Sequence, residues 1–241
     1  MKVDLFQCTD FPMYVMTRAC QMCTGICGKA FDDVELVTKV LRSGHESIAE
    51  HVNFTFLIEG ISRACSHQLV RHRHCSFSQL SQRYAKVGTI EEAREAYDNL
   101  IDENFDDGLL ILNKYFVIPE QIEEHCTGFT MTLSEIFVVY HEYIEGGAKE
   151  EDARAILPTC TKTNVMMTVN LRELMHICNE RLCNRAQGEI RELVTKMRDL
   201  VIEEIPAMVE FLVPKCEKYG HCFEEKSCGL MPKMGIDDER F

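Results

Sequence analysis

The sequence predicts an α+β fold, a single domain in which a mixed or antiparallel β-sheet is flanked by long helices. Three observations support this prediction. The chain has 241 residues, of which 46% are apolar and 27% charged, which is a globular composition with enough length for one buried core. Short segments of alternating apolar residues predict strands. Longer segments with apolar residues at helical spacing predict amphipathic helices.

The first half of the chain is expected to contain two strands and two helices. Residues 2–6 predict an opening or edge strand, and residues 33–42 predict a helix with one apolar face. In residues 51–58 apolar and polar side chains alternate, which predicts a half-buried strand. Helical spacing from Ser62 onward predicts a helix, whereas the many hydroxyl groups of residues 76–81 predict a loop.

The strongest predicted helix opens at Pro119 and ends before Gly146, with His141 on its polar face. Its apolar stripe, which includes Cys126 and Tyr140, is expected to lie in the core. The remaining predicted elements are a short helix, a strand and two helices, over residues 150–157, 165–169, 171–182 and 188–213.

The formal net charge of −13 argues against non-specific binding to nucleic acid, because such binding needs many cations that neutralise phosphates. The longest apolar runs are far too short to span a bilayer, so we expect no membrane segment. The start of the chain lacks the unbroken apolar stretch of a signal peptide, which predicts a cytoplasmic protein. In that compartment the 13 cysteines are expected to be reduced thiols.

This acidic chain contains one dense basic run, RHRHCSFSQLSQRY, at residues 71–84, and no Asp or Glu lies between Glu59 and Glu91. Arginine offers a planar, permanently charged fork that suits phosphate, and Ser and Gln side chains add neutral hydrogen bonds. The run therefore indicates either a site for a phosphorylated ligand or a solvated basic face that pairs with acids elsewhere in the chain.

The basic run belongs to a longer pattern. Arg71-His72-Arg73 is followed, after seven residues, by Ser81 and then by Gln82-Arg83-Tyr84. This pattern resembles the signature of the flavin-dependent thymidylate synthases, the ThyX family. Further segments resemble the family in the same order, at residues 44–56, 152–158, 168–172 and 179–190.

The resemblance covers most of residues 1–213, although it is thin between Gly88 and Glu145. It implies one catalytic domain over residues 1–213, followed by an irregular, cysteine-rich tail at residues 214–241. It also implies a homotetramer with active sites between subunits, each site holding FAD, dUMP and a folate. The implied reaction is the reductive methylation of dUMP to dTMP, with methylenetetrahydrofolate as carbon donor, FAD as hydride carrier and NADPH as reductant.

The resemblance implies a set of site residues for each ligand. For dUMP the set is Gln68, Arg71, Gln79, Ser81, Arg83, Arg154 and Arg181. For FAD the set is Ser47, Glu50, Arg71, His72, Arg73, His74, Asn170, Arg172 and His176. The chain departs from the family at Gln79, which stands where some members carry Glu, and the positions of His74 and His176 vary within the family.

Methylation of uracil requires a nucleophilic ring carbon, obtained either by adding a thiolate to the ring or by stabilising negative charge on it. Arg181 suits the second route as the catalytic residue, because a guanidinium keeps its proton and stays fully charged. Cys75 is the candidate for the thiolate route, and Ser81 with His72 or His74 as base is a further candidate nucleophile. The resemblance favours Arg181 as catalyst and a phosphate-binding role for Ser81.

Two groups of residues have spacing typical of metal ligands. They are Cys20, Cys23 and Cys27 near the N-terminus, and Cys216, His221, Cys222 and Cys228 in the tail. The family needs no metal, so we expect free thiols in the first group. The spacing of the second group fits no standard zinc finger, and we predict no metal site there either. Two other classes of function stay open at this point: a noncatalytic nucleotide- or RNA-binding module without flavin, and a metal-dependent redox protein built on the first group.

Overall fold

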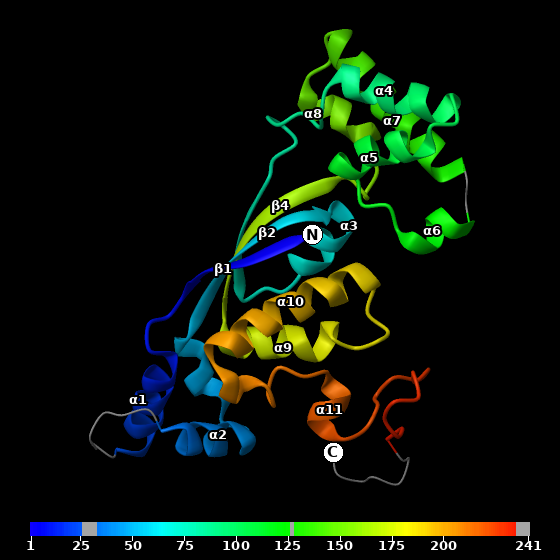
Figure 1. Ribbon diagram of the computed structural model, residues 1–241. Helices are drawn as coiled ribbons and strands as arrows, with labels where there is room; N and C mark the ends of the chain where they lie inside the picture. Colours follow the sequence, from blue (N-terminus) through cyan, green and yellow to red (C-terminus); the bar gives the residue numbers. More distant parts are fainter. Residues whose placement is uncertain (26–32, 126–127, 235–241) are drawn as a thin grey trace. The chain divides into compact units, whose positions relative to one another are not determined.

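The computed structural model describes residues 1–25, 33–125 and 128–234. It contains helices and one antiparallel four-stranded sheet with the strand order β1-β2-β4-β3. Three of these strands, β1, β2 and β4, are labelled in Figure 1. The strands are β1 (Lys2–Cys8), β2 (Asn53–Ser62), β3 (Cys75–Gln79) and β4 (Lys162–Asn170). The predicted combination of helices with an antiparallel sheet is therefore confirmed, and β1 is an edge strand as expected.

The chain forms two compact units. The first comprises Met1–Ile58, Gln68–Ser78 and Met166–Phe241, and the second comprises Glu59–His67 and Gln79–Val165. Strands β2 and β4 begin in one unit and end in the other. The expected division into a catalytic domain over residues 1–213 and a tail over residues 214–241 stays a prediction.

The first unit is built around α9 and α10. Asn170 caps α9, because its Oδ1 accepts a hydrogen bond from the backbone N–H of Glu173 at 2.8 Å. One face of α9 is buried, and α10 packs against both α9 and β1. The helical elements of this unit are α1 (Pro12–Thr24), α2 (Val34–Arg42), η1 (Glu46–His51), α9 (Leu171–Arg181), α10 (Gly188–Glu204), η3 (Pro206–Met208) and α11 (Lys215–Tyr219).

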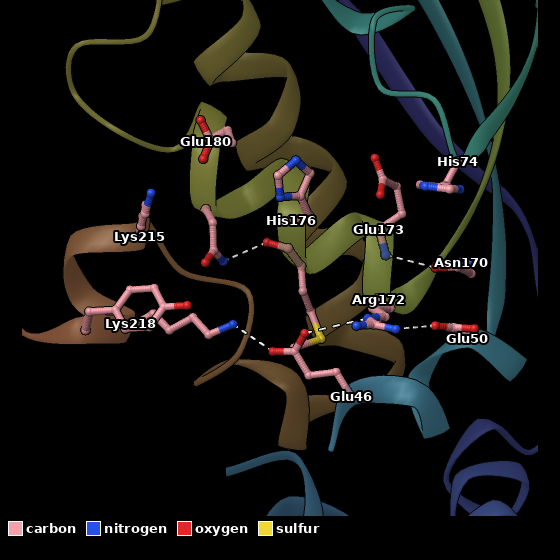
Figure 2. A pocket seen from close by; sticks show the side chains of 13 residues that line it. Glu46, Glu50, His74, Asn170, Arg172, Glu173, His176, Glu180, Lys215 and Lys218 are labelled. Atoms are coloured by element: carbon pink, nitrogen blue, oxygen red, sulfur yellow. Dashed lines mark hydrogen bonds and ion pairs between the residues drawn. The ribbon is translucent and has the colours of Figure 1, made fainter. Parts of the chain in front are cut away.

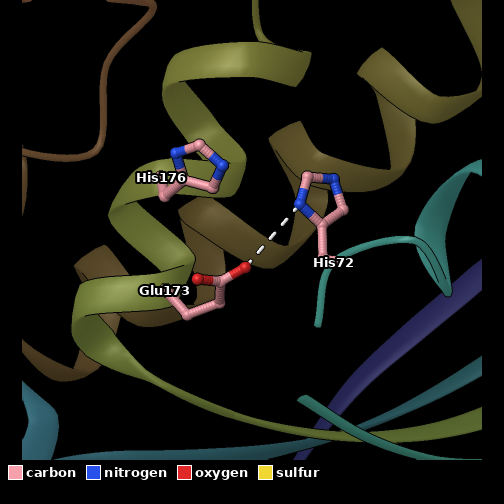
Figure 3. Close-up of side chains that lie close together, drawn as sticks. All are labelled: His72, Glu173 and His176. Atoms are coloured by element: carbon pink, nitrogen blue, oxygen red, sulfur yellow. Dashed lines mark ion pairs between the residues drawn. The ribbon is translucent and has the colours of Figure 1, made fainter. Parts of the chain in front are cut away.

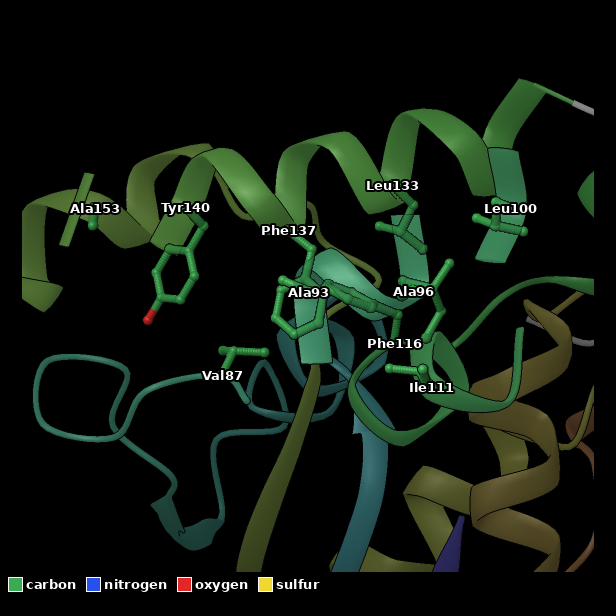
Figure 4. Packing of buried hydrophobic residues seen from close by; sticks show 11 residues of the cluster. Val87, Ala93, Ala96, Leu100, Ile111, Phe116, Leu133, Phe137, Tyr140 and Ala153 are labelled. Carbon is green, nitrogen blue, oxygen red and sulfur yellow. The ribbon is translucent and has the colours of Figure 1, made fainter. Parts of the chain in front are cut away.

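The second unit is mainly helical and has its own core. Phe137 and Tyr140 of the long helix α7 are fully buried among apolar side chains from α4 and α5 (Figure 4). At Gly88, where φ is +62°, a Cβ would lie 2.7 Å from Cζ of Phe137, so only glycine fits this close approach. The helical elements here are α3 (Arg63–Leu69), most of which belongs to this unit, with α4 (Ile90–Ile101), α5 (Phe105–Tyr115), α6 (Glu120–His125), α7 (Gly128–Glu145), α8 (Glu150–Ala153) and η2 (Arg154–Ile156).

Three expectations need correction. The predicted loop at residues 76–81 is wrong, because residues 75–79 form strand β3, in which half-buried Cys75 and Phe77 alternate with exposed serines. The single helix predicted from Pro119 is two helices, α6 and α7, and Cys126 lies outside the described residues. His141 does not lie on an exposed polar face, since it is buried at 4% exposure. Its Nε2 has a polar partner there, the carbonyl oxygen of Val87 at 2.9 Å.

The predicted elements at β1, α2, β2, α3, β4 and α9 are confirmed within a few residues. The helix predicted at residues 188–213 is shorter than expected, because α10 ends at Glu204 and is followed by the separate turn η3. The helix predicted at residues 150–157 is the short α8 followed by η2, and the described part of the tail, up to residue 234, contains one short helix, α11. Within the described residues, no helix combines the length and the apolar character needed to cross a membrane.

Candidate active site

A cavity of about 720 Å³ lies in the first unit, bordered by η1, one face of α9 along its length, and α11 (Figure 2). Its size lies within the range of roughly 300–1,000 Å³ that is usual for ligand and cofactor pockets. Most of the side chains that line it are polar or charged. They are Glu46, Glu50, His74, Asn170, Arg172, Glu173, Met175, His176, Asn179, Glu180, Lys215, Lys218 and Tyr219.

Helix α9 supplies the largest share of this lining. Its apolar residues, such as Leu174 and Ile177, are buried, which turns the polar face of the helix away from the core. Arg172 and His176 are four residues apart and therefore follow each other along that polar face. The amphipathic pattern of α9 thus places both side chains at the cavity.

The guanidinium of Arg172 lies between two carboxylates of η1. Its Nη1 donates a hydrogen bond to Oε1 of Glu50, and its Nε lies 3.8 Å from Oε2 of Glu46. The other oxygen of Glu46 is 2.7 Å from Nζ of Lys218 on α11. The cavity therefore contains cations that can bind phosphate together with carboxylates that can accept hydrogen bonds from ligand hydroxyls.

Five of the nine residues predicted for FAD line this one cavity: Glu50, His74, Asn170, Arg172 and His176. The other four are not among its lining side chains. Ser47, Arg71 and Arg73 are exposed to solvent, whereas His72 is buried. The structure thus gathers more than half of the predicted flavin set, and the assignment of each residue to flavin stays a prediction.

His72 lies in the turn before β3 and faces α9 (Figure 3). Its Nε2 accepts a hydrogen bond from Nε of Arg181 at 3.2 Å, and its Nδ1 is 3.8 Å from Oε1 of Glu173. Burial, and then the positive charge of Arg181, lower the pKa of His72 to about 4. The imidazole is therefore neutral near pH 7, so its contact with Glu173 is not an ion pair under those conditions.

Three residues predicted for dUMP belong to the first unit. Nε2 of Gln68 donates to Oε1 of Gln187 at 3.0 Å, and Arg71 is exposed in the turn after α3. Arg181 is half-buried at the end of α9, where His72 holds its Nε. Within the described residues, neither Nη1 nor Nη2 of Arg181 has a hydrogen-bond partner. The two terminal groups of its guanidinium are therefore available to a ligand.

The other four residues predicted for dUMP belong to the second unit. Glu151 joins two of them, because its Oε2 lies 2.9 Å from Nη2 of Arg83 and its backbone oxygen accepts from Nε of Arg154 at 3.1 Å. Oγ of Ser81 accepts from the backbone N–H of Arg83 at 3.3 Å. Nε2 of Gln79 donates to Oγ of Ser66 at 2.9 Å, with Oγ1 of Thr163 at 3.2 Å.

Sequence comparison decides the family. Residues 4–207 match the family model described as "Thymidylate synthase complementing protein". The chain belongs to this family. It is 41% identical to a flavin-dependent thymidylate synthase of Pyrococcus furiosus over 209 residues, which cover 83% of this chain and 76% of that protein. It is 39% identical to the enzyme of the same name from Pyrococcus horikoshii over 246 residues, covering 96% and 92%.

Structural comparison agrees at the level of the fold. A crystal structure of the flavin-dependent thymidylate synthase ThyX from Helicobacter pylori, complexed with FAD and dUMP, superposes with a TM-score of 0.74 at 23% identity. The match covers 88% of this chain and 100% of that one. The resemblance of the RHR-to-SQRY pattern to the ThyX family is therefore confirmed.

In this member of the thymidylate synthase complementing family, part of the cavity comes from outside the matched residues 4–207. Lys215, Lys218 and Tyr219 on α11 line it, and the sequence reasoning missed all three. Their spacing is a signal in the sequence, because Lys218 and Tyr219 follow Lys215 by three and four positions, and residues at these spacings share one face of a helix.

Cys75, the candidate for the thiolate route, has the properties of a poor nucleophile. Burial, and then the negative charge of Glu173, raise the pKa of Cys75 to about 12, so its thiol stays protonated near pH 7. Cys20 and Cys23 lie on α1, and Cys27 lies outside the described residues. Among the residues that the structure describes, His72, Glu173 and His176 are the only group with metal-ligand geometry, and the four tail ligands do not form one.

Proposed function

We propose that this protein is a flavin-dependent thymidylate synthase, which methylates dUMP reductively to dTMP in dTMP biosynthesis. Methylenetetrahydrofolate is the proposed carbon donor and NADPH the proposed reductant. The observation that carries the proposal is the convergence of Glu50, His74, Asn170, Arg172 and His176 on one cavity of about 720 Å³. Membership of the thymidylate synthase complementing family supports the interpretation of this cavity as the flavin site.

The chemistry of the cavity fits FAD. A dinucleotide needs cations for its diphosphate, and Arg172, Lys215 and Lys218 supply them. Its hydroxyl groups need acceptors, and the carboxylates of Glu46 and Glu50 lie beside those cations. When bound, FAD supplies the hydride transfer that the reaction requires.

The flavin-binding residues that we propose are the nine predicted from the resemblance. They are Ser47, Glu50, Arg71, His72, Arg73, His74, Asn170, Arg172 and His176. The proposed dUMP-binding residues are Gln68, Arg71, Gln79, Ser81, Arg83, Arg154 and Arg181. For Arg83 and Arg154, binding of a phosphate would require competition with Glu151, which now holds both side chains.

Arg181 is the proposed catalytic residue. A guanidinium keeps its proton near neutral pH and stays fully charged, so it stabilises negative charge on the uracil ring throughout the reaction. Its free Nη1 and Nη2 have the fork geometry that suits two adjacent acceptors on a ring. The raised pKa of Cys75 supports this route over a thiolate adduct.

A homotetramer with active sites between its subunits, and a cytoplasmic location, complete the proposal. The homotetramer rests on the resemblance to the family, and the cytoplasmic location rests on the sequence, with which reduced thiols at the 13 cysteines agree. No nucleic-acid or membrane partner is proposed.

Two measurements on the purified protein test the proposed function. The first is the visible absorption spectrum, in which bound flavin is expected. The second is anaerobic incubation with dUMP, methylenetetrahydrofolate and NADPH, in which dTMP is expected to form. A colourless protein that binds nucleotides without forming dTMP would instead support a noncatalytic nucleotide-binding module.

A further inference from the structure

Three side chains of the first unit form a chain of contacts that ends at Arg181. Oε1 of Glu173 lies 3.8 Å from Nδ1 of His72, and Nε2 of His72 lies 3.2 Å from Nε of Arg181. The His72 side chain is 7% exposed and that of Glu173 is 11% exposed. Low exposure leaves little room for other conformations, so the contacts define a fixed order: carboxylate, imidazole, guanidinium.

The contact with Arg181 determines which ring nitrogen of His72 carries the proton. All nitrogen atoms of a guanidinium are donors, so Nε2 of His72 must accept through its lone pair. A neutral imidazole then has its proton on Nδ1, the atom that faces the carboxylate of Glu173. The lowered pKa of His72 agrees with a neutral ring. At 3.8 Å the carboxylate is too distant for a direct hydrogen bond, but its charge still favours a proton on Nδ1.

This arrangement argues against a metal centre at the same residues. His72, Glu173 and His176 offer ligand atoms within 4.8 Å of one another, which resembles the two-histidine, one-glutamate set of catalytic zinc sites. A metal ion on this face would need the lone pair of Nδ1, and the contact with Arg181 puts a proton there. Metal binding would therefore require His72 to release Arg181.

We propose that His72 and Glu173 are positioning residues that orient the guanidinium of Arg181 toward the uracil ring of the substrate. The inference rests on the proposed role of Arg181 in the synthase reaction. An arginine side chain has several rotatable bonds, and the contact at Nε fixes the plane of the fork before substrate binds. Because the contact uses Nε alone, Nη1 and Nη2 remain free for the ring. His72 is itself restrained, since its ring meets the edge of the His176 ring with 5.9 Å between centroids.

The first test needs no activity. In protein labelled with ¹⁵N-histidine, NMR is expected to show His72 with Nδ1 protonated and Nε2 unprotonated, and His72→Gln assigns the signal by its disappearance. A protonated Nε2 on His72 would overturn the proposal, because that nitrogen could not then accept from Arg181.

The second test separates positioning from a general structural role. His72→Leu is expected to lower kcat for dTMP formation by about tenfold to a hundredfold, the usual effect of losing a hydrogen bond to a charged group. His72→Gln is expected to recover most of that loss, because its amide oxygen can reach the position of Nε2, whereas the shorter His72→Asn is not. His67→Leu, on the exposed side of α3, serves as the control and should match the wild type.

A double-mutant cycle completes the test. If His72 acts through Arg181, adding His72→Leu to Arg181→Ala should cause little further loss of kcat. Full additivity, or unchanged kcat in His72→Leu with flavin still bound, would overturn the positioning role while leaving the synthase function intact. Absence of dTMP formation by the wild type would instead refute the proposed function, and with it any role of His72 in that reaction.

Discussion

Nζ of Lys218 lies 2.7 Å from Oε1 of Glu46, which joins α11 to the wall of the cavity. The second oxygen of Glu46 is 3.8 Å from Nε of Arg172. Glu46 thus lies between a lysine of the tail and an arginine that we propose to bind flavin. Lys218 shares the carboxylate of Glu46 with Arg172 and so partly offsets its negative charge. Lys218 also adds a cation to the cavity.

Lys218→Ala is therefore expected to weaken flavin binding. Partly exposed ion pairs contribute about 0.2–1 kcal/mol, so the dissociation constant for FAD should rise by about 1.4-fold to fivefold. Fluorescence titration of the flavin-free protein measures it. Lys226→Ala, an exposed tail substitution away from the cavity, should leave the constant unchanged, and equal values for both variants would contradict the role of α11.

Arg172→Ala should lose more FAD than dUMP. A hydrogen bond between charged groups contributes about 1.5–3 kcal/mol, and its removal also leaves Glu50 without its partner in the cavity. The measurement is the flavin content after gel filtration, with dUMP affinity determined in parallel. Arg42→Ala is the control: it removes a comparable exposed ion pair, with Glu210, outside the cavity, and its flavin content should equal that of the wild type. Unchanged flavin content in Arg172→Ala would refute the assignment.

Serine substitutions of the cysteines should leave dTMP formation nearly intact. We expect Cys20→Ser, Cys23→Ser, Cys27→Ser and Cys75→Ser each to stay within about tenfold of the wild type, a range that about 1.4 kcal/mol of lost packing would cover. The raised pKa of Cys75 gives the reason, since a protonated thiol is a poor nucleophile. Abolished turnover in Cys75→Ser, with FAD and dUMP still bound, would revive the thiolate mechanism.

The stability of the fold should depend on pH through His72. Its pKa is about 4 when folded against an ordinary 6.5, so between these values the unfolded chain binds a proton that the folded chain does not. The contribution of neutral His72 to the stability of the fold is therefore fully present above pH 6.5 and is lost as the pH falls toward 4. Urea unfolding measures the free energy of unfolding at pH 7 and at pH 5. The loss between these two pH values should be smaller by about 1–2 kcal/mol in His72→Gln than in the wild type. Equal decreases in both proteins would contradict the buried, neutral state of His72.

The sequence predicted those parts of the site that depend on local periodicity and on the long family pattern. Arg172 and His176 could be placed together because both the apolar spacing of α9 and the resemblance point to the same face. The helix at α4 carried a readable signal that was missed, the capping box of Thr89 and Glu92. The hydroxyl-rich composition of β3 predicts a loop, whereas the alternation of its serines with Cys75 and Phe77 is the pattern of a strand.

Other features could not be read from the chain because they depend on distant contacts. The buried ring of His141 has its polar partner in the carbonyl oxygen of Val87, 54 residues away. Lys218 reaches Glu46 across 172 residues, and α11 lies beyond the matched family region. The contact between His72 and Arg181 spans 109 residues, and a short motif cannot reveal a pairing over such a separation.

The most direct test of the account is the anaerobic reaction of Arg181→Ala, with dTMP formation and NADPH oxidation measured on the same sample. Loss of one preorganised donor to a developing negative charge typically costs about a hundredfold to a thousandfold, so dTMP formation should fall by at least about a hundredfold. Flavin content and NADPH oxidation should persist, and Arg181→Lys should recover only part of the loss, because an ammonium lacks the planar fork. Full dTMP formation by Arg181→Ala would contradict the central claim that this guanidinium activates the uracil ring.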